Sequence, residues 1–188
     1  MSKSSISVSL EFTPNPNTLK FVVNQSLLEK GAANFINVSD TEKSPLAQKL
    51  FGVKGVSGVL IGTNFITITK EEKGEWDVIA DEVPKVIENH LQQNLSVMSP
   101  DWSYESVQTE TDSNSIASRI KAILDAEIRP AVAMDGGDIT FGKFENGIVY
   151  LHLQGACSSC PSSIMTLKMG VENRLKEAIP EVVEVVQI

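Results

Sequence analysis

Residues 155–178 read GACSSCPSSIMTLKMGVENRLKEA and contain the only two cysteines of the 188-residue chain, Cys157 and Cys160. The apolar residues after Pro161 recur at helical spacing, and proline is favoured at the first position of a helix because its missing N–H costs no hydrogen bond there. We therefore expect a helix that begins just after Cys160. The preceding apolar stretch ends near Leu153, so the two cysteines are expected in a loop that joins a strand to a helix.

Cysteines at such a junction are suited to ligand chemistry. The unpaired amides and the positive end of the helix dipole stabilise thiolates. Small glycine, alanine and serine residues fill the rest of the loop, which lets its backbone approach a bound group closely. A disulfide between Cys157 and Cys160 would close too small a loop to stabilise a domain. The pair is therefore expected to bind a metal or a cluster, or to act as a redox dithiol.

Spacing alone leaves three kinds of site open: an iron-sulfur cluster, a tetrahedral zinc ion and a thioredoxin-like dithiol. Zinc and a 4Fe-4S cluster each need about four protein ligands, whereas one chain offers two thiols. His152 is close in sequence, but its alternation with Leu151 and Leu153 places it on the opposite face of their strand from the core. A symmetric dimer would supply four thiolates, two from each chain.

Outward from the loop, the sequence predicts an α+β domain over residues 115–188. A helix begins at Ser115, which is a good N-cap, and is limited by Pro130. MDGGDI at 134–139 is a glycine turn that leads into two strands at hairpin spacing. With the helix after Cys160 and a last strand, VVEVVQI, the predicted order is αββαβ. This order lacks the early βαβ unit of a thioredoxin fold, which disfavours the dithiol redox site.

Residues 1–93 predict a second small α+β domain of order ββαββα. Turn residues TPNPNT separate two apolar stretches that form a hairpin, and a short helix is expected at 45–51. Two further strands follow, and a closing helix packs on the sheet although Pro84 lies near its middle. His90 is expected on the polar face of that helix.

Residues 94–114 contain four acidic residues, no Lys or Arg, and many Ser and Thr. This composition is typical of a flexible acidic linker between two domains. Trp102 and Tyr104 are unusual in such a segment, and we expect them to dock on one of the domains.

Charge and hydropathy exclude several classes of protein. The formal net charge is -8 and the pI is about 4.8, which disfavours nucleic acid as a partner because phosphate binding needs clustered Lys and Arg. No apolar run approaches the roughly 20 residues of a membrane span. The opening MSKSSISVSL lacks a secretory signal and an Arg-rich transit peptide. A bacterial cytoplasmic protein is expected, or a mitochondrial matrix protein if a transit peptide has been removed.

These motifs together resemble those of the Nfu family of iron-sulfur cluster carriers. MDGGDI, a hairpin and GACSSCPSSIMTLKMGVENRLKEAIPEV resemble the hallmark of the NifU C-terminal domain over nearly all of residues 115–188. EFTPNPNTLKF, LFGVKGVSGVLIG and FITITK resemble the N-terminal Nfu domain that many members carry.

The resemblance implies that Cys157 and Cys160 ligate a 4Fe-4S cluster that two subunits of a homodimer share. It implies a carrier rather than an enzyme: an upstream assembly scaffold donates the cluster, and apo iron-sulfur proteins receive it. The N-terminal domain would be an interaction module, and the Asp135–Asp138 turn would shape the cluster-binding domain. A dithiol redox protein and a zinc-bridged dimer are the alternatives.

Overall fold

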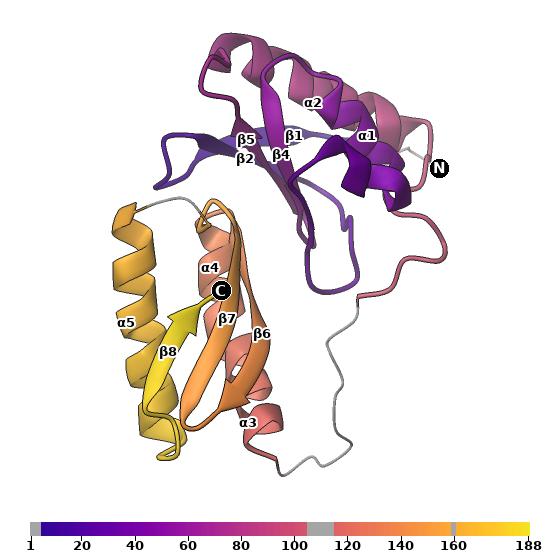
Figure 1. The fold of residues 1–188 in the computed structure, drawn as a ribbon. Coiled ribbons are helices and arrows are strands. Elements are labelled where there is room, and N and C mark those ends of the chain that lie inside the picture. The colour runs from indigo at the N-terminus through magenta and orange to yellow at the C-terminus, as the bar shows by residue number, and fades with distance from the viewer. Residues whose placement is uncertain (1–4, 105–114, 159–160) are drawn as a thin grey trace. The chain divides into compact units, whose positions relative to one another are not determined.

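The computed structural model describes residues 5–104, 115–158 and 161–188 (Figure 1). The chain divides into two compact units, residues 1–104 and 105–188, and both combine helices with a β-sheet. The predicted α+β class with two domains is therefore confirmed. Residues 105–114 of the predicted linker and Cys160 lie outside the described residues.

The N-terminal unit is an antiparallel five-stranded sheet of order β1-β2-β5-β4-β3, and helices α1 and α2 cover one of its faces (Figure 1). The strands are β1 (Val8–Phe12), β2 (Thr18–Val23), β3 (Ala33–Phe35), β4 (Val56–Ile61) and β5 (Phe65–Lys70). The helices are the 3-10 helix η1 (Val38–Lys43), α1 (Pro45–Phe51) and α2 (Trp76–Gln92). The predicted ββαββα order is thus observed with two additions, β3 and η1. A three-residue strand is too short to show an alternating pattern in the sequence.

The closing helix α2 carries the buried residues Ile79, Val83, Ile87 and Leu91 on its core face, and Pro84 lies inside it. His90 shares this face and is only 1% exposed, so the prediction that it lies on the polar face is wrong. Position 90 follows Ile87 by three residues, which places it on the same apolar stripe. Its Nε2 lies 3.0 Å from the Ser96 carbonyl oxygen, to which it donates in the Nε2–H tautomer.

The segment after α2 packs on the N-terminal unit. The Ser44 hydroxyl donates to the Val97 carbonyl oxygen at 2.8 Å, and Trp102 packs against the core. A Cβ at Gly31 would overlap the Tyr104 ring, so the ring lies directly against that glycine. Both aromatic residues therefore dock on a domain, as predicted.

The C-terminal unit contains a three-stranded sheet of order β6-β7-β8. Strands β6 (Gly137–Glu145) and β7 (Ile148–Gly155) are antiparallel, and β8 (Glu184–Gln187) is parallel to β7. The helical elements are α3 (Ile116–Ile123), the π-helical turn η2 (Leu124–Ile128), α4 (Arg129–Met134) and α5 (Pro161–Ala178). The buried core joins α3, α5 and the sheet through residues such as Ile120, Leu151 and Leu175. The predicted αββαβ order is confirmed.

The sequence predicted that Pro130 ends the first helix of this unit, but the helical backbone continues past it. The backbone passes through the π-helical turn η2 and continues as α4 to Met134, with Pro130 in the first turn of α4. A proline inside a regular α-helix clashes with the carbonyl four residues earlier. The wider π turn loosens the backbone ladder just before Pro130 and so lets the helix continue.

A buried ion pair fixes the start of β6 to this helix. The Arg129 guanidinium donates two hydrogen bonds of 2.8 Å to the two carboxylate oxygens of Asp138, and Asp138 is 4% exposed. Arg129 also contacts Asp125 at 3.0 Å. A two-bonded guanidinium–carboxylate pair holds both planes in one geometry.

No helix within the described residues is long and apolar enough to cross a bilayer.

Arg129→Met should destabilise the C-terminal unit by about 3–5 kcal/mol because it leaves the Asp138 carboxylate buried without its charge partner. Urea unfolding followed by far-UV circular dichroism measures this loss, and Arg129→Met/Asp138→Leu should recover much of it. Arg174→Met is the matched control, because it breaks the exposed Arg174–Glu127 pair and should have a much smaller effect. Equal losses of unfolding free energy in Arg129→Met and Arg174→Met would contradict the structural role of the buried Arg129–Asp138 pair.

His90 should make the stability of the N-terminal unit depend on pH. Burial lowers the pKa of His90 below its usual value of 6.5, so the unfolded chain binds the proton more readily. The free energy of unfolding is therefore highest above pH 6.5 and should fall as the pH drops below that value. Both tryptophans, Trp76 and Trp102, lie in this unit, so their fluorescence reports its unfolding.

The matched variant is His90→Gln, because its side-chain amide can donate to the Ser96 carbonyl oxygen but does not titrate. Between pH 7.5 and about pH 5, the unfolding free energy of the wild type should fall more steeply than that of His90→Gln. Parallel pH profiles for the two proteins would show that the His90 ring does not contribute.

Candidate functional site

The cysteine loop joins β7 to α5, as predicted. Gly155 ends β7 with a φ of +61°, and α5 begins at Pro161. The Ser158 backbone N–H and hydroxyl both donate to the Gly155 carbonyl oxygen, at 3.2 and 2.8 Å. These bonds fold the start of the loop into a tight turn and place Cys157 on its inner side, where the residue is 4% exposed.

Cys157 lies directly against the glycine turn that precedes β6. A Cβ built at Gly137 would overlap the Cys157 Sγ and would lie 3.0 Å from the Cys157 Cβ. Any side chain at Gly137 would therefore displace the thiol. Gly137 also pairs with Gly155 in the β6–β7 ladder. Each of the two strands therefore has a glycine next to the cysteine loop.

The neighbouring glycine completes this connection. Gly136 has a φ of +78°, a conformation that favours glycine, and its carbonyl oxygen accepts a 3.2 Å hydrogen bond from the Ala156 N–H. The MDGGD turn and the cysteine loop are therefore one structural unit. Asp138, two residues after Gly136, binds Arg129 and so ties this unit to α4.

Sequence reasoning predicted the turn at Asp135–Asp138 but missed its contact with Cys157 and the Arg129–Asp138 pair. The adjacent glycines were the available signal, because two glycines at the start of a strand suggest a close approach of another chain segment. The segment that approaches is far away in sequence. The pairing register of β6 and β7 was needed to identify it.

His152 does not join the site. It is exposed on β7 and pairs with Thr140, whereas Val149 and Leu151 on the same strand are buried. Among the described residues, no group of three or more His, Cys, Asp or Glu side chains could hold a metal ion. Cys157 is the one thiol in the described part of the chain, and Cys160 lies outside it.

The donor chemistry fits an iron-sulfur cluster or zinc, because thiolates are ligands of both. The number of donors does not suffice for either within one chain, whose only two thiols are Cys157 and Cys160. The loop directly precedes an 18-residue helix, and the amides and dipole at such a terminus favour negative charge. The site is therefore suited to a thiolate-bound group whose remaining ligands come from elsewhere.

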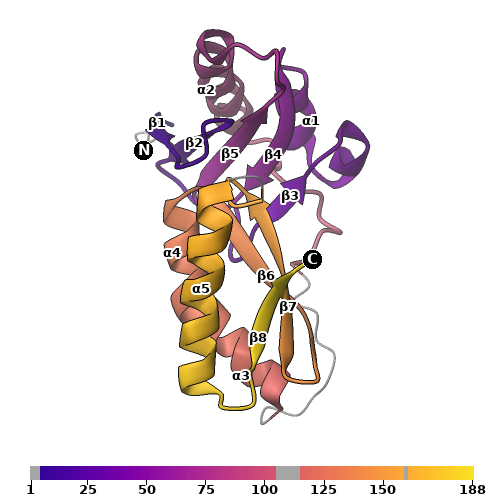
Figure 2. The ribbon, with the colours of Figure 1, turned by 60° about the vertical axis from the view of Figure 1, so that its left-hand side comes forward.

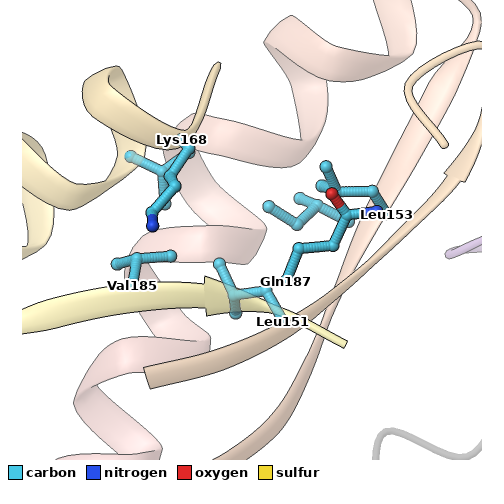
Figure 3. A pocket seen from close by; sticks show the side chains of 7 residues that line it. Leu151, Leu153, Lys168, Val185 and Gln187 are labelled. Carbon is cyan, nitrogen blue, oxygen red and sulfur yellow. The ribbon is translucent and has the colours of Figure 1, made fainter. Parts of the chain in front are cut away.

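A small apolar cavity lies between α5 and the sheet of this unit (Figure 3). The described side chains that line it are Ile139, Leu151, Leu153, Lys168, Val171, Val185 and Gln187. Its volume is about 20 Å³, which is room for one water molecule at most. It is a packing gap rather than a ligand site.

Two family models match the chain. The model of the NifU-like domain matches residues 120–186, and the model of the Nfu/NifU scaffold protein N terminus matches residues 8–94. The matched ranges fall in the C-terminal and N-terminal units, respectively. Together they include the glycine turn, the cysteine loop and all five strands of the N-terminal sheet.

Relatives of known name resemble the whole chain. The NFU1 iron-sulfur cluster scaffold homologs, mitochondrial, of Drosophila willistoni and Drosophila virilis are 43% and 46% identical over 189 aligned positions that cover 100% of this chain. Those positions cover 65% and 63% of the two relatives, so the chain spans slightly less than two thirds of their length.

A solution structure of a NifU-like protein from Saccharomyces cerevisiae is 26% identical, with a TM-score of 0.48, and the alignment covers 54% of this chain and 92% of that one. The assignment of the chain to a family rests on the two matched domain models and on the sequence identity to the NFU1 homologs over the full chain. An N-terminal Nfu unit followed by a NifU-like unit that carries the cysteine loop is the arrangement of the Nfu family, and the chain belongs to this family.

Proposed function

We propose that this protein is an iron-sulfur cluster scaffold and carrier that binds the cluster as cargo through Cys157 and Cys160. The observation that carries the proposal is the contact of the Cys157 thiol with Gly137, because the glycine turn leaves room for a sulfur atom and for no further side chain. Family membership and the scaffold names of the Drosophila relatives support the same role.

The proposed cargo is a 4Fe-4S cluster held between two copies of the chain. Such a cluster needs about four thiolates, and each chain has two. A two-fold axis beside the loop would bring the two pairs together. Met165 and Met169 are exposed one turn apart on α5, close in sequence to the loop. Flexible apolar side chains of this kind suit contact with a second protein surface.

Cluster uptake must uncover the thiol. Cys157 is 4% exposed in the single chain, so a cluster cannot reach its sulfur in this conformation. The loop has a left-handed glycine at Gly155 and only small residues between Ala156 and Cys160, so a local backbone change can turn the sulfur outward. The proposed carrier therefore protects its thiol when empty and exposes it when it loads.

Release to an apo-protein is a ligand exchange at iron. A thiolate of the recipient forms an Fe–S bond as the bond from Cys157 or Cys160 breaks, and the departing thiolate accepts a proton from solvent. No electrons are transferred, so no oxidant or reductant is needed. An upstream assembly scaffold would load the site by the reverse exchange. No step requires a catalytic residue, and we therefore propose a carrier rather than an enzyme.

We also propose a mitochondrial location, because the two Drosophila relatives carry this word in their names. The expectation of a bacterial cytoplasmic protein has no support from these relatives.

Anaerobic reconstitution with iron and sulfide should load about two iron and two sulfide ions per chain and convert the protein to a dimer. Cys157→Ala and Cys160→Ala should each abolish this uptake, and His152→Ala is the control because it removes a potential metal ligand that is exposed on β7 and does not join the site. Uptake of one zinc ion per dimer without sulfide would refute the proposal that the two cysteines bind an iron-sulfur cluster. Rapid reduction of insulin disulfides would instead favour a dithiol redox protein.

Gly137→Ala should destabilise the C-terminal unit by about 1–3 kcal/mol and should make the Cys157 thiol react faster with a thiol reagent, because its Cβ would push the Cys157 Sγ out of its buried position. The matched control is Gly170→Ala on α5, where a built Cβ meets nothing within 4 Å. Alanine favours a helix over glycine, so this control should leave stability equal or higher. Unchanged stability and unchanged thiol reactivity in Gly137→Ala would remove the glycine turn from the site.

A further inference from the structure

Strand β1 forms one edge of the sheet in the N-terminal unit, beside β2 (Figure 2). Among the described residues, no strand pairs with its outer side. Exposed edges pair readily with other chains, and proteins usually protect them with short strands, prolines or inward-pointing charges. At the other edge of the sheet, β3 has only three residues. Strand β1 has five residues and no proline, and its one charged residue, Glu11, is ion-paired with Lys20 of the same chain.

The side chains of β1 extend the core face of the sheet beyond its helical cover. Leu10 and Phe12 pair with Phe21 and Leu19 of β2, which are buried in the core. Paired residues in a sheet point to the same face. Exposure nevertheless rises along the strand, since Val8 packs against the core, Leu10 is 38% exposed and Phe12 is 87% exposed.

The backbone of the same residues points outward. The Asn24 N–H donates to the Ser7 carbonyl oxygen, so Ser7 directs its backbone groups to β2. These groups alternate in direction along an antiparallel strand. Ser9 and Glu11 therefore also bond to β2, whereas Val8, Leu10 and Phe12 present their N–H and C=O groups to the free edge.

These features make β1 complementary to itself. In an antiparallel pair of two β1 strands centred on Leu10, Val8 of each strand faces Phe12 of the other, and all outward backbone groups find partners. Ser9 would face Glu11, so no like charges oppose each other. Glu11 is moreover ion-paired with Lys20 of its own chain at 3.0 Å.

We propose that the edge strand β1 pairs with β1 of a second copy of this chain and joins the two N-terminal sheets into one. The contact is small, so the dimer is weak, with a dissociation constant of about 10 µM or more. It does not involve the cysteines and forms without a cluster. Its consequence for the proposed carrier is a higher effective concentration of one cysteine loop near the other.

Two substitutions that introduce opposite charges at position 9, Ser9→Lys and Ser9→Glu, test the proposed register. The pair Ser9–Glu11 occurs twice in the dimer and is of the kind that does not exchange backbone hydrogen bonds, where side chains are closest. Ser9→Lys should therefore tighten the dimer about threefold to tenfold, and Ser9→Glu should weaken it by a similar factor. High salt should reduce both effects.

Sedimentation velocity of the full-length chain over a wide concentration range measures these changes. The background is Cys157→Ala/Cys160→Ala, which has no thiol, so loss of the cluster function cannot produce the result. Leu10→Lys should abolish the dimer because it places two like charges together on the two-fold axis. Asn173→Lys and Asn173→Glu, on the exposed face of α5, are controls for the added charge, and circular dichroism checks each fold.

The proposal fails if the cysteine-free chain remains a monomer at about 1 mM. It also fails if Leu10→Lys leaves a dimer intact, or if both Ser9 variants change it in the same direction. Pairing of β1 with an added peptide while the chain itself stays monomeric would assign the edge to a different partner and overturn the self-pairing.

Discussion

The absence of a side chain at Gly137 is the constraint on which the C-terminal unit depends. The Cys157 sulfur occupies the space that a Cβ would need, and the two flanking backbones meet through the Gly136–Ala156 hydrogen bond. The start of β6 is in turn held by the buried Arg129–Asp138 pair. A change at any of these positions would be transmitted to the thiol because the interior is closely packed.

One cysteine loop supplies only part of the ligands of the proposed cluster site. The fold buries one thiol against Gly137, and the described residues contain no group of three or more His, Cys, Asp or Glu side chains that could hold a metal ion. A protein that must release its cargo benefits from incomplete ligation, since a site closed by one chain would hold the cluster too firmly for exchange. In the proposed dimer, a cluster shared between two chains would couple cluster binding to association, so loss of the cluster should weaken the dimer.

The order of elements in both units could be predicted because long apolar periodicities determine it. The segments of α2, β7 and α5 have clear spacing, and MDGGD is an unmistakable turn. Three of the features that escaped this reasoning have a physical explanation. Strand β3 is too short for a pattern, the π turn lets the helix pass Pro130, and the stripe on α2 admits a polar residue, His90, because Ser96 offers it a carbonyl oxygen.

The position of the cysteine loop between a strand and a helix was predictable, but the surroundings of Cys157 were not. Two cysteines in a polar loop before a helix indicate ligand chemistry from the sequence alone, whereas the contact with Gly137 depends on a β6–β7 register that no local pattern specifies.

Native mass spectrometry of the anaerobically reconstituted chain tests the central claim most directly. The account predicts one 4Fe-4S cluster on dimers and none on monomers. A monomer that retains an intact cluster would contradict it.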